Sequence, residues 1–135
     1  MKFLPSFAVV LGSALTGCAT APGVVKTAVS GVTSPEKVAI GRAHQRWDAL
    51  FASDFDKAYE FISPANKLTM PVTEYKYRVS SQYWRKYSVR DANCEPDLCV
   101  VRVNLDYQLQ GIPLSQVVTE KWILDGGIWW YVFQG

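Results

Sequence analysis

A stretch of strict alternation near the C-terminal end constrains the fold of this chain more than any other part of the sequence. Alternate residues from 99 to 109 are apolar or aromatic, and from residue 102 onward those between them are polar. Successive side chains of a strand point to opposite faces of a sheet, so the pattern predicts a half-buried antiparallel strand. Its apolar face comprises Cys99, Val101, Val103, Leu105, Tyr107 and Leu109, and its polar face Arg102, Asn104, Asp106, Gln108 and Gln110.

Three other segments predict the rest of the sheet. Each contains aromatic and β-branched residues at alternate positions, and each is bounded by residues that favour turns. The expected turns are Pro96-Asp97, Gly111-Ile112-Pro113 and Asp125-Gly126-Gly127, where proline presets φ and glycine accepts positive φ. The three strands are expected at residues 83–93, 116–124 and 128–133.

The sequence before residue 83 shows helical spacing instead. Ser34, Pro35 and Glu36 predict a helix start, because serine caps free amides, proline is tolerated in the first turn and glutamate favours the positive helix end. An apolar stripe then recurs at helical spacing as far as Phe51. The stripe is Ile40, Ala43, Trp47, Leu50 and Phe51, and the opposite face is expected to carry Arg42, Gln45 and Arg46.

Two shorter helices are expected after the first. Residues 55–62 carry a second stripe, which Ser63-Pro64 ends because the residue before proline resists the helical conformation. Residues 66–71 are expected to be a connection. A third helix is expected from Thr73 to about Gln82. A strand remains the alternative there, because apolar side chains also alternate at Tyr75, Tyr77 and Val79.

Helices followed by a meander of long strands indicate the α+β class. Two groups of residues carry a resemblance: Arg46–Leu50, Asp54–Phe61 and Ser63-Pro64 at the start, and Glu120–Trp122, Asp125-Gly126 and Trp129–Tyr131 at the end. These groups resemble the opening and the closing hairpin of the nuclear transport factor 2-like superfamily. The resemblance implies N-terminal helices packed on a curved antiparallel sheet, a cone-shaped α+β roll with an internal pocket, over residues 34–135. The superfamily contains isomerases, dehydratases, small-molecule binders and interaction domains, so the fold alone chooses no function.

The first eighteen residues predict where the protein resides. A positive start at Met1-Lys2 precedes a mostly apolar run from Phe3 to Leu15. This order is typical of a secretory signal peptide, and the apolar run is too short to span a bilayer core of ~30 Å. Leu15-Thr16-Gly17-Cys18 resembles the lipobox of bacterial lipoproteins. The alternative is a plain signal peptide with an incidental cysteine.

The lipobox resemblance implies cleavage before Cys18 and a diacylglycerol on its sulfur. Residues 1–17 would then be the signal peptide, residues 18–33 a flexible tether, and the bilayer a partner through acylated Cys18. Ala19 follows the cysteine, where an inner-membrane retention signal would commonly be aspartate. Similarity to enterobacterial lipoproteins therefore favours the outer membrane, with the domain facing the periplasm.

The two remaining cysteines, Cys94 and Cys99, flank the turn pair Pro96-Asp97. An oxidising periplasm suits a disulfide across this hairpin. Two free thiols or a metal pair are the alternatives. A metal site needs more ligands than this, and the only histidine, His44, is distant in sequence, so no metal site is expected.

Candidate site residues are sparse. No phosphate-binding loop, nucleophile elbow or metal-binding helix motif is present, so no catalytic residue and no cofactor is assigned. His44 lies beside the apolar stripe of the first helix and could reach an internal pocket, although a flanking histidine with a water or carbonyl partner is the alternative. Glu120 shares a strand face with Trp122, and a lysine or arginine on the neighbouring strand is its expected partner. The candidate pocket is His44, Trp47, Tyr59, Tyr77, Trp84, Trp122 and Trp130, with simple core packing as the alternative for each aromatic residue.

Composition narrows the function further. The formal net charge is +2 and no run of lysine or arginine occurs, so nucleic acid is not an expected partner. A hydrophobic content of 49% indicates a folded domain. The expected function is therefore an envelope lipoprotein whose non-catalytic domain binds a partner protein or a small apolar ligand. The alternative is a tethered isomerase or dehydratase that uses His44 with a carboxylate.

Overall fold

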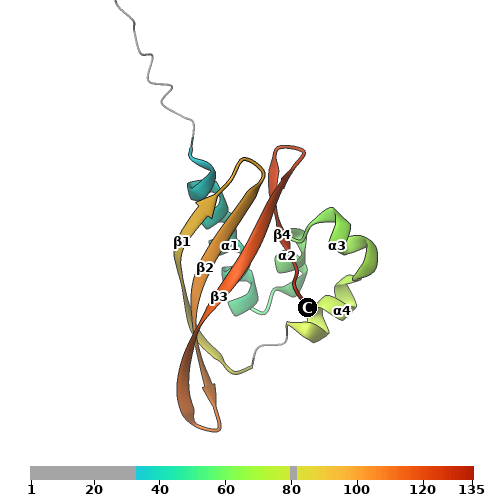
Figure 1. The fold of residues 1–135 in the computed structure, drawn as a ribbon. Coiled ribbons are helices and arrows are strands. Elements are labelled where there is room, and N and C mark those ends of the chain that lie inside the picture. The colour runs from blue at the N-terminus through green and yellow to red at the C-terminus, as the bar shows by residue number, and fades with distance from the viewer. Residues whose placement is uncertain (1–32, 80–81) are drawn as a thin grey trace, which may run out of the picture. The chain divides into compact units, whose positions relative to one another are not determined.

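Helices precede strands in the computed structural model, which describes residues 33–79 and 82–135 (Figure 1). This is the α+β class that the sequence predicts. The expected signal peptide, Cys18 and the tether up to residue 32 lie outside the described residues. The helices are α1 (Pro35–Phe51), α2 (Phe55–Glu60), α3 (Pro64–Thr69) and α4 (Val72–Arg78), and the strands are β1 (Trp84–Cys94), β2 (Leu98–Leu109), β3 (Ile112–Asp125) and β4 (Ile128–Val132).

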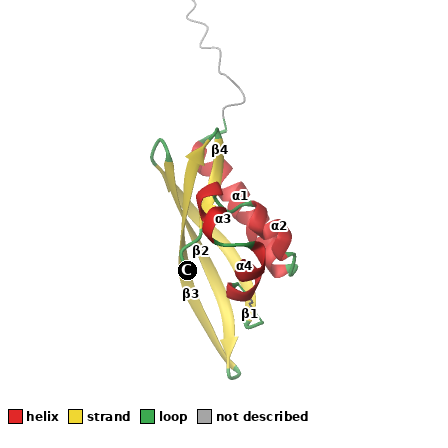
Figure 2. Cartoon of the chain, turned by 90° about the vertical axis from the view of Figure 1, so that its right-hand side faces the viewer, coloured by secondary structure: helices red, strands yellow, loops and turns green. Residues whose placement is uncertain are grey.

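The strands form one antiparallel sheet in the order β1-β2-β3-β4. Figure 2 shows the helices gathered on one face of this curved sheet, with the β2–β3 hairpin extending beyond them. On β2, the alternate residues from Cys99 to Leu105 are buried against the helices, as the alternation predicts. Leu109 lies on the same face but is 47% exposed, because the hairpin extends beyond the helices at this point.

α1 supplies most of the helical side of the core. The Oγ of Ser34 caps it by accepting a hydrogen bond from the Lys37 N–H at 3.4 Å. Trp47 and Leu50 are buried as predicted, but the placement of Arg46 on the solvent face is wrong, since only 3% of Arg46 is exposed. Arg46 lies three residues after Ala43 and four before Leu50, and this spacing puts it on the buried face.

Ser63 starts a helix where a connection was predicted. Its Oγ accepts a hydrogen bond from the Asn66 N–H at 3.2 Å, and Pro64 occupies the first turn of α3. The Ser63-Pro64 pair therefore separates two helices instead of ending one. A proline that cannot continue a helix is well suited to begin the next, because N–H groups of the first helical turn have no intrahelical partner and the missing N–H of proline costs nothing there.

The second helix ends at Glu60, before the predicted Ile62, because the backbone after Glu60 forms hydrogen bonds with the sheet. The N–H of Tyr131 on β4 donates to the Phe61 carbonyl at 2.8 Å, and the Ser63 N–H donates to the Tyr131 carbonyl at 2.9 Å. The third predicted helix is confirmed as α4, although it ends at Arg78 rather than near residue 82.

The β2–β3 hairpin is longer than predicted. The turn lies at Gln110-Gly111, with φ of 50° and 79°, and Leu109 pairs directly with Ile112. The glycine takes this left-handed backbone without a steric penalty. Ile112 and Pro113, which were predicted to belong to the turn, are therefore the first residues of β3.

The turn between β1 and β2 is closed by a disulfide between Cys94 and Cys99. These residues are direct partners in the strand register, with Cα atoms 4.0 Å apart. The bond therefore ties the ends of two neighbouring strands.

Among the helices that the structure describes, none has the length and apolar character needed to cross a membrane.

Candidate functional site

The centre of the site is a buried ion pair between a helix and the sheet. Nη1 of Arg46 on α1 donates to Oε1 of Glu120 on β3 at 2.6 Å, and the side chains are 4% and 1% exposed. Trp47 Nε1 donates to the same oxygen at 2.8 Å, and Trp122 Nε1 donates to Oε2 at 3.1 Å. Both carboxylate oxygens are thus held by N–H donors.

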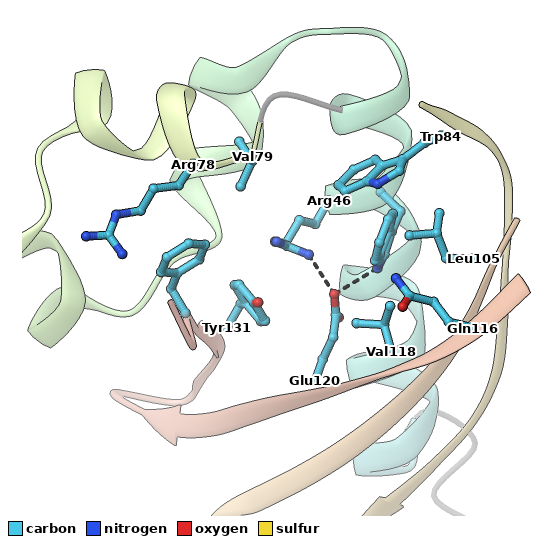
Figure 3. Close-up of a pocket in the computed structure, with 11 residues that line it drawn as sticks. Arg46, Arg78, Val79, Trp84, Leu105, Gln116, Val118, Glu120 and Tyr131 are labelled. Carbon is cyan, nitrogen blue, oxygen red and sulfur yellow. Dashed lines mark hydrogen bonds and ion pairs between the residues drawn. The ribbon is translucent and has the colours of Figure 1, made fainter. Parts of the chain in front are cut away.

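A cavity of about 170 Å³ lies beside this pair, between α1, α4 and the sheet (Figure 3). Its walls combine aromatic rings with a few polar groups, the combination that small-molecule sites usually present. Figure 3 shows side chains from α1, α4 and the strands converging on this space. The lining residues are Arg46, Trp47, Arg78, Val79, Trp84, Leu105, Gln116, Val118, Glu120, Tyr131 and Phe133.

Burial and charge act in opposite directions on the pKa values of this pair. Burial raises the pKa of the Glu120 carboxyl, against the opposing effects of the Arg46 charge and the three N–H donors. Burial is also the largest single influence on the pKa of the Arg46 guanidinium and lowers it, but Glu120, Tyr131 and Tyr75 together outweigh burial and raise that pKa. The Arg46 guanidinium carbon also lies 3.7 Å from the centre of the Tyr131 ring, a cation–π contact. Arg46 is therefore a positively charged group in the cavity wall.

Two polar atoms near this centre are buried without a hydrogen-bond partner among the described residues. They are Nε of Arg46 and the hydroxyl of Tyr75 on α4. A buried donor with no partner costs free energy, and most such groups in native proteins are paired. Arg46 thus has hydrogen-bonding capacity that the surrounding side chains leave unused.

The predicted pocket residues divide between this cavity and other places. Trp47 and Trp84 line it, with ring centroids 5.1 Å apart. Trp122 is fully buried beside it and reaches Glu120, but does not line it. Tyr59 packs on Tyr75 and donates its hydroxyl to the Met70 carbonyl at 2.8 Å, so it belongs to the helical layer.

Tyr77, Trp130 and His44 lie outside the cavity. Tyr77 is 86% exposed on α4. Trp130 faces the other side of β4 from Tyr131 and lies under two cations, with Arg42 at 5.6 Å and Lys67 at 5.4 Å from its ring centre.

His44 is exposed and contacts β1 instead. Its Nδ1 lies 3.5 Å from the hydroxyl of Tyr87, which donates to the Asp48 carboxylate. Burial, together with this carboxylate, raises the pKa of Tyr87. A histidine and an acid therefore meet on one tyrosine, but on an exposed flank of α1 rather than in the cavity.

The charged members of the site were only partly predictable from the sequence. The signal for Glu120 was present, because it shares a strand face with buried Trp122. Its partner was expected on a neighbouring strand, and this is wrong: the partner is Arg46, 74 residues earlier on α1. The signal for Arg46 was its spacing from Ala43 and Leu50 on the buried face.

Among residues 33–79 and 82–135, no group of three or more His, Cys, Asp or Glu is placed to hold a metal ion.

Comparison with known proteins identifies similar folds but no family. No protein-family model and no curated protein matches this chain. A SEC-C motif containing protein from Rhodopseudomonas palustris has a TM-score of 0.57 at 14% identity, covering 68% of this chain and 73% of its own. A Campylobacter jejuni protein named as an NTF2-like transpeptidase has a TM-score of 0.45 at 12% identity, covering 68% of this chain and 94% of its own. At such identities a likeness concerns the fold alone and assigns no activity.

Proposed function

We propose that this protein is a non-catalytic lipoprotein of the bacterial envelope, with a domain of the nuclear transport factor 2-like type that binds a small, mostly apolar ligand. The order Leu15-Thr16-Gly17-Cys18 supports the lipid anchor, and Ala19 supports the outer membrane. The ligand would occupy the cavity beside Arg46 and Glu120. A hydrogen-bond acceptor on the ligand would match the donors that line it.

The occupied state of Glu120 carries the non-catalytic part of this proposal. A general base uses a lone pair to take a proton from a substrate, and an ionised carboxylate has about four lone-pair sites. Three of these sites on Glu120 already accept N–H donors, from Arg46, Trp47 and Trp122, and the Arg46 charge also opposes protonation of the carboxylate. The carboxylate therefore holds the cavity wall in place and positions Arg46.

The size of the cavity supports a small ligand. An apolar cavity of about 150 Å³ in another protein admits benzene. The space beside Arg46, at about 170 Å³, therefore fits a group of roughly one aromatic ring. Arg46 and Gln116 would face the polar part of such a ligand, and Trp47 and Trp84 its apolar part.

Binding can be tested with single-ring probes, because two tryptophans line the cavity. Benzoate and toluene would be titrated into the purified full chain while tryptophan fluorescence is followed. A saturable change is expected, stronger for benzoate because its carboxylate can accept hydrogen bonds from Arg46. Val118→Phe should abolish the change by filling the cavity that Val118 lines.

Val117→Phe is the matched control, since it makes the same change on the opposite face of the same strand. It should leave probe binding intact. The proposal fails if neither probe gives a saturable change, or if both variants reduce the signal equally.

A further inference from the structure

Part of β3 has an open edge. β3 pairs with β2 from Ile112 to Ile123, which is most of its length, but with β4 only from Lys121 to Asp125. Among the described residues, no strand pairs with the other edge of β3 between residues 112 and 120. Figure 1 shows this lower part of β3 at the margin of the sheet, beyond the end of β4.

The hairpin register identifies the backbone groups on this edge. Asp125 and Ile128 flank the two-residue turn Gly126-Gly127 and are direct partners, so the N–H and C=O of Asp125 point toward β4. Every second residue of β3 shares that direction. The open edge therefore presents the backbone groups of Pro113, Ser115, Val117 and Thr119, and Pro113 lacks an N–H.

The side chains along this edge do not protect it. Residues 112–119 contain no charged side chain, and Ile112, Leu114 and Val117 are 58%, 39% and 49% exposed. Edge strands of monomeric proteins are usually protected by charges, bulges or twisting. The opposite edge of this sheet shows that protection: β1 carries Arg85, Lys86 and Arg90 and has two irregularities in its register.

We propose that a second copy of this chain pairs with the open edge, β3 against β3 in antiparallel register, forming one continuous sheet across the dimer. A two-fold axis at Gln116 would place Ser115 opposite the partner's Val117 and Pro113 opposite the partner's Thr119. Every free N–H of the edge then meets a carbonyl of the other copy. Because Pro113 has no N–H, the backbone carbonyl of the Thr119 opposite it is the one group in each copy left without a donor. This inference does not rest on the proposed ligand.

The same register suits the side chains. On the helix-bearing face, Leu114 would lie opposite the partner's Val118, so apolar side chains now exposed would be covered. On the outer face, Ser115 would lie opposite the partner's Val117. No like charges meet, because the paired segments carry none. Sliding the strands further would bring the turn at Gly111 against the end of the partner's β4, which limits the register.

Cysteine cross-linking tests the register directly. In this arrangement the two Gln116 residues face each other as a non-hydrogen-bonded pair with Cα atoms about 4.5 Å apart, within the span of ~4.4–6.8 Å that a disulfide accepts. Gln116→Cys in the full chain, oxidised in isolated envelopes, should give a covalent dimer on a non-reducing gel. Leu68→Cys, on α3 and 87% exposed, is the control and should stay monomeric.

A second substitution separates edge pairing from chance collision. Val117→Pro removes an N–H that points to the open edge and leaves the β2–β3 ladder intact, because proline is tolerated on the free side of an edge strand. Combined with Gln116→Cys it should eliminate the dimer band, whereas Val117→Ala should retain it. Val117→Lys, which keeps the N–H but adds a charge near the axis, should also eliminate the band.

Three outcomes would overturn the proposal. One is a Gln116→Cys chain no more cross-linked than Leu68→Cys. Another is a dimer band that survives both Val117→Pro and Val117→Lys. The third is a Gln116→Cys adduct with a different envelope protein in place of the dimer, since the edge would then serve a partner other than a second copy.

Discussion

Arg46 and Glu120 join the first helix to the third strand through a contact of 2.6 Å that is closed off from water. Neither charge could remain there alone, because an unpaired buried charge is far less stable than a hydrated one. The pair therefore fixes the position of α1 over the sheet. The pair also keeps the positive charge of Arg46 in the cavity wall. Glu120, which holds Arg46 there, is itself held by hydrogen bonds from Trp47 and Trp122.

Removing Glu120 should destabilise the fold strongly. We expect Glu120→Ala to lower the free energy of unfolding by about 3–5 kcal/mol, because Arg46 is left charged and buried. Urea unfolding of the full chain, followed by tryptophan fluorescence, measures this. Asp56→Ala is the control: Asp56 pairs with Lys76 at 2.7 Å but is 72% exposed, so its loss should cost at most about 1 kcal/mol. Equal costs for the two variants would contradict the role assigned to burial.

Trp47 and His44 lie three residues apart on α1 but should respond differently to alanine. Trp47 is 2% exposed and donates to Glu120, so Trp47→Ala should cost about 3–5 kcal/mol. His44 is exposed, and His44→Ala should leave thermal melting nearly unchanged and should complement a deletion strain. A folded His44→Ala protein that fails to complement, while other exposed polar variants succeed, would favour the enzyme alternative.

Tyr75 should make the fold sensitive to alkali. Burial raises the pKa of Tyr75 above its ordinary 10.0, so the folded state keeps a proton that the unfolded state releases. Stability from this group is therefore full below pH 10 and is lost as the pH rises toward the folded pKa. Tyr75→Phe should unfold less steeply with pH above 10 than the wild type, as measured by urea unfolding across pH. Tyr77→Phe changes an exposed tyrosine of the same helix, and an identical effect there would refute the assignment.

The Cys94–Cys99 disulfide should be present in exported protein. Intact mass after alkylation should show no modified thiol at these positions before reduction and two afterwards. The paired Cys94→Ser and Cys99→Ser variant should lose roughly 2 kcal/mol of stability, since the closed loop is short. Alkylation of both residues in unreduced protein from the periplasm would exclude the bond.

Cys18 should be the site of lipid attachment. Cys18→Ser should abolish labelling with palmitate and either release the domain or leave an uncleaved precursor. Sucrose-gradient fractionation of the wild type should place it with the outer membrane. Label that persists on Cys18→Ser would remove the basis for the anchor, and migration with the inner membrane would remove the basis for the outer-membrane assignment.

Elements whose signals are local could be predicted from the sequence. Alternation on β2, the stripe on α1 and the glycine turn at Gly126-Gly127 each depend on residues close together in the chain, and each predicted its element. The disulfide was predictable for the same reason, because its cysteines are only five positions apart, on either side of one turn. The helix at residues 64–69 was missed because Ser63, which caps its start, was interpreted only as the end of the preceding helix.

Tertiary structure alone decided the site. Arg46 and Glu120 are 74 residues apart, and no local pattern says which buried acid a buried arginine will meet. The placement of His44 was settled by the approach of Tyr87 on β1, and the end of α2 by hydrogen bonds to Tyr131 on β4. Such contacts depend on how the sheet curves over α1, which is a property of the packed chain, because burial and long-range pairing are energies of the whole fold and not of any one segment.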